Sequence, residues 1–347
     1  MLVQLVAGLF AITRAPQLIG TSFDLTGNSS ADWSAVMQVD TSTGAASQLT
    51  AYTEAYHAQA VGLDDETVWL LLDGGVLQSY DLKSGKLNET IAVELDLALC
   101  DPPWGACVMG MHWSPRYRAF VGLGLGWPYN ATLGHATTSM VLTADPRQRV
   151  AGQYGVEHVT VVPKVSVDGS LAMYEDASAF DDASSTYFVV MSTLSAGSSR
   201  RLLRRPSPSV RDSGSADLLY AFDLATGAAR IVPVAGATVP FPFVVPFGGK
   251  HVVASGGLKG LPFVSIDTRS GAMEPLASGE HSPGIVSDNS MVLDQASHVA
   301  YAIFVHGEES ILGGINLTSG RLIPHTAVKH TIRFPQVVCS QQKTAPL

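Results

Sequence analysis

Short apolar runs alternate with clusters of Gly, Asp, Ser and Thr along most of the chain. Residues 76–80 (VLQSY) and 218–222 (LLYAF) are typical, and each run is followed directly by Asp. Runs of this length, bounded by turn residues, predict β-strands rather than helices. No run reaches the roughly eighteen apolar residues that a transmembrane helix needs. The pattern therefore predicts an all-β protein whose strands are joined by short turns.

One turn motif follows several of these runs: Asp or Asn, two variable residues, Ser or Thr, then Gly. The Asp or Asn side chain accepts hydrogen bonds from backbone amides two residues on. The Gly adopts the positive φ that closes the turn. Copies begin at Asp40, Asp81, Asp223, Asp267 and Asn316. Each copy leads into another short run, so each predicts a β-hairpin.

The spacing of these hairpins predicts how they are organised. Asp40 and Asp81 are 41 residues apart, and Asp223 and Asp267 are 44 residues apart. Units of about 40–50 residues with about four strands each are typical of β-propeller blades. A degenerate copy at residues 140–147 completes six units, although seven would also fit the long interval before Asp223. We therefore expect a single propeller over residues 16–340, with four antiparallel strands in each blade. A strand near residues 332–338 should pair with the N-terminal strands and close the ring, because closure removes free sheet edges.

The motif and its spacing resemble the broad family of β-propellers whose blades carry a D-x-x-[ST]-G hairpin. That family includes the YVTN-type and quinoprotein-type repeats. The resemblance covers most of the chain and implies a fold rather than an activity. Quinoprotein repeats usually place a Trp shortly after the Gly, whereas here Ala45 follows Gly44 and Lys86 follows Gly85. This departure argues against a quinone cofactor.

Composition excludes several other classes of protein. The 347-residue chain has only 15% charged residues and a formal net charge of −9. Ordinary soluble domains are about one quarter charged. Glu and Lys are scarce, which argues against a helical bundle. The acidic balance argues against a nucleic-acid ligand, and the 46% hydrophobic content argues against general disorder.

The N-terminus and the asparagines bear on the compartment. Residues 1–15 begin with an apolar stretch that no basic residue precedes, so they are either a signal peptide or the first strand. Four of the five asparagines open an N-x-[ST] sequon: Asn28, Asn88, Asn130 and Asn316. This excess favours an extracellular or lumenal glycoprotein. Turn chemistry alone also explains Asn316, and a cytoplasmic location stays open.

Three cysteines fit that compartment without establishing it. Cys100 and Cys107 bracket a loop rich in Pro and Gly, which a disulfide could close. Closing a loop of this size contributes roughly 2.5 kcal/mol when the geometry is unstrained. No second pair of Cys or His lies at ligand spacing, so the pair does not predict a metal site. Cys339 is left as a buried thiol or as the partner of an intermolecular bond.

Two segments interrupt the period. Residues 127–138 contain the Asn130 sequon and predict an exposed loop. Residues 177–216 predict an insertion inside the propeller, with four arginines between positions 200 and 205 in a Pro- and Ser-rich, disordered loop. Such a loop could be a processing site, a kinase site at Ser207, a patch for an anionic partner, or a solvated linker.

No strong catalytic constellation occurs in the sequence. The weak candidates are His57, Glu157, His158 and His281, which we expect near one mouth of the central channel, where propellers commonly bind ligands. There they could act as ligands or as acid–base groups. The alternative is that they are rim histidines with structural hydrogen bonds.

Lactonase-type six-bladed propellers hold a divalent cation with channel carboxylates and asparagines. Here Asn289 is the one Asn outside a sequon, so such a site is hard to assemble, although Asp168, Asp288 or Glu157 could offer oxygen ligands to Ca²⁺. The sequence therefore favours a monomeric, secreted or lumenal propeller that binds a protein or glycan, with no cofactor. The alternative is a lactonase-like hydrolase or lyase with Ca²⁺ or another divalent cation in the channel.

Overall fold

The computed structural model describes most of the chain between residues 16 and 338. The described ranges are 16–23, 34–50, 59–64, 66–72, 75–94, 108–130, 135–151, 157–168, 171–193, 217–237, 239–248, 250–257, 263–276, 285–306, 309–328 and 333–338. Within these ranges all regular secondary structure is β-strand, so the predicted all-β class is confirmed there. A search of the same residues finds no helix with the length and hydropathy to cross a bilayer.

The described strands form five sheets, four of which have four antiparallel strands each. Sheet A contains β24 (Arg333–Val338), β1 (Gln17–Phe23), β2 (Ser34–Asp40) and β3 (Ala46–Gln48). Sheet C contains β12 (Leu171–Asp181), β13 (Thr186–Thr193), β14 (Asp217–Asp223) and β15 (Ala229–Pro233). Sheet D contains β16 (Val239–Phe247), β17 (His251–Gly257), β18 (Val264–Asp267) and β19 (Met273–Pro275). Sheet E contains β20 (Ile285–Asp294), β21 (Val299–His306), β22 (Glu309–Asn316) and β23 (Arg321–Val328).

The remaining sheet, B, has eight strands and consists of two antiparallel meanders. The first contains β4 (Gln59–Asp64), β5 (Thr67–Leu72), β6 (Val76–Asp81) and β7 (Leu87–Glu94). The second contains β8 (Val108–Ser114), β9 (Ala119–Asn130), β10 (His135–Ala151) and β11 (Glu157–Asp168). The outer strands β7 and β11 pair in parallel over three residue pairs, His158 with Ala92 through Thr160 with Glu94. The prediction of six separate four-stranded sheets is therefore not met, because this parallel pairing merges two meanders into one sheet.

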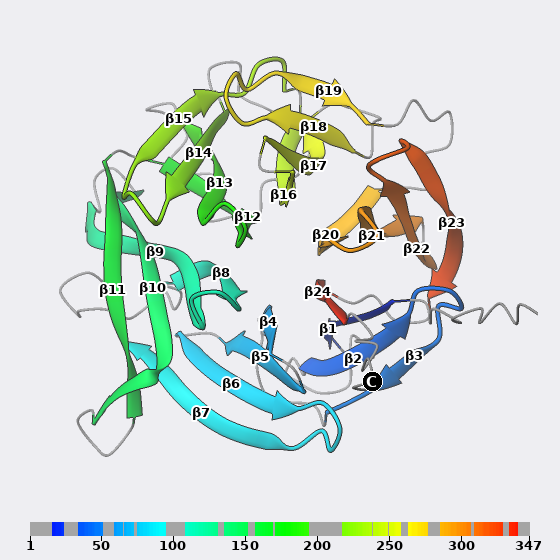
Figure 1. The fold of residues 1–347 in the computed structure, drawn as a ribbon, viewed down its shortest axis with the longest axis horizontal. Helices are drawn as coiled ribbons and strands as arrows, with labels where there is room; N and C mark the ends of the chain where they lie inside the picture. The colour runs from blue at the N-terminus through cyan, green and yellow to red at the C-terminus, as the bar shows by residue number, and fades with distance from the viewer. Residues whose placement is uncertain are drawn as a thin grey trace, which may run out of the picture.

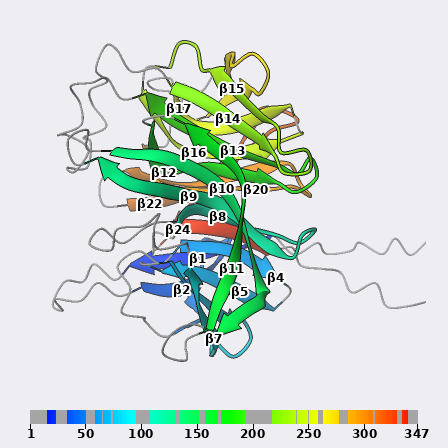
Figure 2. The same ribbon diagram turned by 90° about the vertical axis from the view of Figure 1, so that its left-hand side faces the viewer.

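The sheets are arranged in a ring, with β4, β8, β12, β16, β20 and β24 nearest the centre (Figure 1). Viewed from the side, the strands of neighbouring sheets cross at an angle, as expected for twisted blades (Figure 2). The ring is closed by β24, which pairs antiparallel with β1 and matches Val337 with Leu18. The C-terminal strand therefore completes an N-terminal sheet, as the sequence predicted.

An apolar cluster lies between each pair of neighbours around the ring. One cluster of buried residues includes Val39 of sheet A and Ile303 of sheet E, and another includes Val121 of sheet B and Tyr187 of sheet C. Between sheets D and E, the rings of Phe263 and Phe304 meet edge to face. Strands packed on both faces need apolar side chains on both faces. This packing explains why so few residues of the chain are charged.

The D-x-x-[ST]-G segments form the turns between the third and fourth strands, counted outward from the centre. In the first, Asp40 Oδ1 accepts hydrogen bonds from the backbone N–H of Ser42 and of Thr43, both at 2.9 Å. Gly44 has a φ of 69°. Asn316 Oδ1 accepts the N–H of Thr318 at 3.1 Å and of Ser319 at 2.9 Å in the same way. The predicted turn chemistry is therefore present at both ends of the chain.

These turns also connect neighbouring sheets. A Cβ on Gly85 would lie 1.9 Å from the carbonyl oxygen of Leu49, and one on Gly271 would lie 2.0 Å from that of Pro233. Each turn therefore packs its glycine against the backbone that ends the preceding sheet. The exception is Gly227 in sheet C, where a Cβ would meet no atom within 4 Å.

The two predicted interruptions differ from expectation. Residues 177–193 belong to β12, the following turn and β13, with Tyr187 and Val189 fully buried, so this part of the segment is sheet rather than insertion. The arginine-rich residues 194–216 lie outside the described residues. Most of 127–138 extends the β9–β10 hairpin rather than forming a loop, because the backbone of Tyr129 pairs with that of Ala136.

Candidate binding pocket

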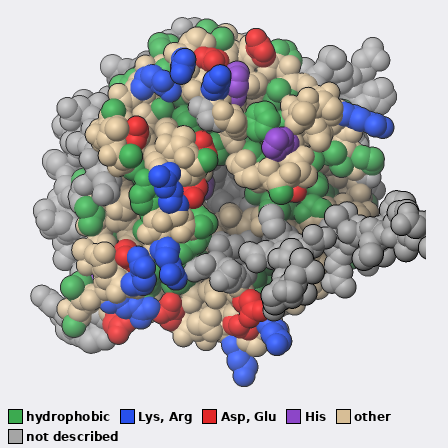
Figure 3. Space-filling view, in the orientation of Figure 1, with side chains coloured by type: hydrophobic (Ala, Val, Ile, Leu, Met, Phe, Trp, Pro, Cys, Tyr) green, Lys and Arg blue, Asp and Glu red, His purple; other side chains and the backbone are tan. Residues whose placement is uncertain are grey.

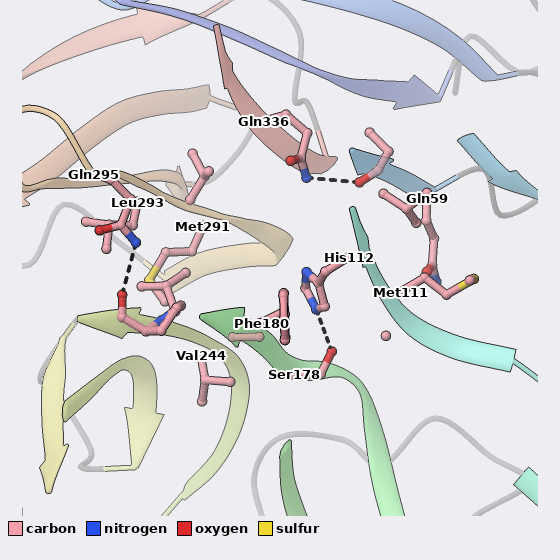
Figure 4. Close-up of a pocket in the computed structure, with 17 residues that line it drawn as sticks. Gln59, Met111, His112, Ser178, Phe180, Val244, Met291, Leu293, Gln295 and Gln336 are labelled. Carbon is pink, nitrogen blue, oxygen red and sulfur yellow. Dashed lines mark hydrogen bonds between the residues drawn. The ribbon is translucent and has the colours of Figure 1, made fainter. Parts of the chain in front are cut away.

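A pocket of about 200 Å³ lies on the axis of the ring, where the inner strands converge. Its wall includes residues from all six inner strands. The polar members are Gln59, His112, Ser178, Gln295 and Gln336, and the large apolar members are Met111, Phe180, Val244, Met291 and Leu293 (Figure 4). The centre of the ring is therefore a pocket of mixed polarity, built from the innermost strand of every meander.

His112 on β8 and Ser178 on β12 face each other across two neighbouring inner strands. The His112 Nε2 and Ser178 Oγ atoms are hydrogen-bonded at 3.0 Å (Figure 4). Burial lowers the pKa of His112 to about 4, and a hydrogen bond with the backbone of Ser178 offsets only part of that effect. The imidazole is consequently neutral at pH 7. Beside it, the Tyr187 hydroxyl donates to the Gly110 carbonyl at 3.0 Å and fixes the β8 backbone.

Three glutamines bring primary amides to the other sides of the pocket. Gln336 Nε2 on β24 donates to the Ala60 carbonyl of β4 at 3.1 Å. Gln295 Nε2, just after β20, donates to the Pro246 carbonyl of β16 over a longer 3.5 Å. Each of these bonds joins two neighbouring sheets and orients one amide. Among the described residues, none donates to or accepts from the Gln59 amide.

Among the described residues that line this pocket, none is an Asp, Glu, Lys or Arg. Within the described part of the chain, no group of three or more His, Cys, Asp or Glu side chains lies close enough to hold a metal ion. The described wall can therefore offer amide, hydroxyl and neutral imidazole hydrogen bonds, together with apolar contact.

Of the four predicted catalytic candidates, the structure describes Glu157 and His158. Glu157 and His158 lie on β11, the outermost strand of its meander, so the expectation that they approach the channel mouth is wrong. Glu157 and His158 begin the fourth strand of their meander rather than an innermost strand, because the 17-residue strand β10 precedes them as the third. Glu157 is exposed and accepts a hydrogen bond from Arg149 Nη1 at 2.7 Å. His57 and His281 lie outside the described residues.

Other predicted positions are only partly described. Asp168 ends β11, and Asp288 and Asn289 lie in β20, but only the backbone is described at all three. The sequon residue Asn88 is exposed on β7, and Asn316 begins the turn described above. Asn130 ends β9, with only its backbone described. Asn28, Cys100, Cys107 and Cys339 lie outside the described residues.

The pocket residues themselves were not identified from the sequence. His112 lies near the C-terminal end of the inner strand β8, which ends at Ser114. Its pairing with β9 shifts register between Met109 and His112. This register shift changes which side chains of β8 face the axis, so the alternation of polar and apolar residues does not identify His112.

Comparison with known proteins identifies the fold. Sequence profiles of known protein families give no match, and neither does a comparison with curated protein sequences. Among solved structures, "putative TolB from Agrobacterium tumefaciens" aligns over 90% of this chain and 90% of its own, with a TM-score of 0.50 and 8% identity. At this identity the likeness concerns the fold alone. The protein is thus a β-propeller, similar in architecture to that TolB structure.

Proposed function

We propose that the protein is a secreted or lumenal β-propeller that binds a protein or glycan ligand and does not transform it. The observation that carries the proposal is the axial pocket, whose described wall combines neutral hydrogen-bonding groups with apolar surface. Pockets of this composition orient a ligand through a few polar groups and gain affinity from apolar contact. The similarity to the TolB structure supports the fold on which the pocket depends.

We further propose that the two meanders of sheet B are separate blades. Each has the strand order of sheets A, C, D and E, and the parallel pairing of β7 with β11 spans only three residue pairs. On this count the ring has six blades, five of which carry a D-x-x-[ST]-G turn.

The binding function is tested by blocking the pocket. Gln59→Trp places an indole at a partly buried position in the pocket wall, and Gln148→Trp places one at an exposed position on β10 as the matched control. A panel of neutral glycans, charged glycans and extended peptides is screened for binding to the protein and both variants. Binding that Gln59→Trp abolishes and Gln148→Trp leaves intact, with ligand mass unchanged, supports the proposal. Conversion of a ligand, or the lack of any binding sensitive to Gln59→Trp, contradicts it.

The secretory location has its own test. Asn88 is exposed at a register shift of the β6–β7 pair, so its side chain is accessible for modification. Protein from a secreting eukaryotic host should lose mass on treatment with an N-glycosidase, and Asn88→Gln should reduce that loss. An unchanged mass after treatment would exclude N-glycosylation in that host.

A further inference from the structure

The pocket wall suits an uncharged ligand. Among the described residues that line it, the one titratable side chain is His112, which is neutral at pH 7. A charged group that enters such a pocket loses hydration without gaining an ionic partner among these residues, which disfavours its binding. On the face seen in Figure 3, acidic and basic side chains of the described residues are interspersed around the ring.

The hydrogen-bonding groups come from three sides of the pocket. The Gln59 and Gln336 amides lie on the β4 and β24 side, Gln295 lies beside β16 and β20, and the hydrogen-bonded His112 and Ser178 lie between β8 and β12 (Figure 4). A primary amide both donates and accepts, as does a hydroxyl group. Polar groups on three sides suit a cyclic ligand with hydroxyl groups around its perimeter better than they suit a linear ligand.

The remaining wall is apolar and the space is small. Met111, Phe180 and Met291 offer carbon and sulfur surface between the polar groups. The volume of about 200 Å³ lies below the range of about 300–1,000 Å³ typical of pockets for drug-sized ligands. The space therefore suits a single ring-sized unit with a polar edge and apolar faces.

We propose that the axial pocket binds one uncharged pyranose unit of a glycan. This proposal rests on the binding function proposed above and specifies its ligand. The amides of Gln59, Gln295 and Gln336 bind the ring hydroxyls, and Ser178 with its partner His112 binds a hydroxyl on the opposite side. The apolar side chains contact the C–H faces of the sugar.

The proposal is tested by titration with methyl glycosides of neutral hexoses and of N-acetylhexosamines, and with glucuronic acid as a charged comparison, up to about 10 mM. Gln59→Leu and Gln336→Leu each remove one amide from the pocket, and Gln148→Leu removes an exposed amide elsewhere. We expect at least one neutral glycoside to bind more tightly than glucuronic acid. Each pocket variant should weaken that binding roughly tenfold, as expected for the loss of one or two hydrogen bonds, and Gln148→Leu should leave it unchanged.

Three results would overturn the sugar proposal: no binding of any neutral glycoside, preference for the charged sugar, or binding unaffected by both pocket variants. The wider binding function is judged separately. If a peptide binds and Gln59→Trp blocks it, the binding function stands and the sugar assignment falls. If no member of either panel shows binding sensitive to Gln59→Trp, both fail. Circular dichroism of each variant before titration separates a lost contact from a lost fold.

Discussion

At the residue scale, two glycines allow the effect of backbone strain to be measured separately from the effect of steric contact. Gly227 and Gly271 occupy the same position in equivalent turns, with φ values of 72° and 71°. They differ in surroundings, because a Cβ on Gly271 would lie 2.0 Å from the Pro233 carbonyl oxygen whereas one on Gly227 would meet nothing within 4 Å. The turns are locally alike, and only one of them is held against its neighbouring sheet.

We predict that Gly227→Ala costs about 1 kcal/mol, the strain of a non-glycine residue in the left-handed region. Gly271→Ala should cost about 3 kcal/mol or more, because the Pro233 backbone must also move. Urea unfolding of both variants measures the difference. Equal losses would mean that the turn does not restrain the sheet beside it.

The second residue-scale prediction concerns His112 and pH. Burial lowers its pKa from 6.5 to about 4. Between pH 4 and pH 6.5 the folded protein therefore binds fewer protons than the unfolded chain does. The contribution of neutral His112 to the free energy of unfolding is complete above about pH 6.5 and is lost as the pH falls toward 4. We expect a loss of roughly 1–3 kcal/mol over this window. In His112→Gln, which keeps a polar group near Ser178, urea midpoints should fall less over the same window. A slope equal to that of the unsubstituted protein would assign the effect to other groups.

At the element scale, Arg149 bridges the two strands whose parallel pairing, β7 with β11, joins the meanders of the eight-stranded sheet; we call this pairing the joint. Its Nη1 donates to Glu157 on β11 at 2.7 Å and its Nη2 donates to Glu89 on β7, so one side chain on β10 bridges both outer strands. Beneath it, Val93 and Val159 form a buried pair in the short parallel ladder. The joint therefore combines a small apolar core with a partly exposed ionic bridge.

We predict that Arg149→Met changes global stability by about 1 kcal/mol or less, as is usual for partly exposed ion pairs. It should nevertheless speed amide exchange in residues 92–94 and 158–160, because the joint opens locally more often. Arg147→Met is the matched control, since the Arg147 side chain pairs with Asp145 on its own strand. Hydrogen exchange with mass spectrometry compares the two variants. The same exchange rates in both would show that Arg149 does not hold the joint.

The sequence predicts features that depend on a few neighbouring residues, and it does not predict features that depend on how strands pair. The Asp40 and Asn316 turns are local, since their hydrogen bonds span two or three residues, and the motif alone predicts them. By contrast, the set of inner-strand side chains that face the axis depends on how each inner strand pairs with its neighbour, which is not a local property. Every inner strand shifts register against its neighbour, for example between Met109 and His112 in β8 and between Met173 and Ser178 in β12. One extra residue reverses the alternation of faces, so a period-two pattern cannot identify the pocket wall.

At the scale of the whole molecule, closure depends on one short strand. β24 pairs with β1, contacts the inner strands β20 and β4, and places Val337 against the buried cluster between sheets A and E. The Gln336 amide adds a hydrogen bond to the Ala60 carbonyl in the next sheet. Without β24, one meander loses its inner strand and the ring is left with an exposed edge on β1.

We therefore predict that a chain ending at residue 332 loses its single cooperative unfolding transition and self-associates through the freed edge. Val337→Ala keeps the strand and should cost only about 1 kcal/mol, so it separates the loss of closure from the loss of one side chain. Thermal unfolding by circular dichroism and size-exclusion chromatography measure the two effects. A truncated chain that stays monomeric and unfolds in one transition, as stable as Val337→Ala, would show that the ring does not need its C-terminal strand. In that case the packing of the other inner strands would be enough to hold the pocket together.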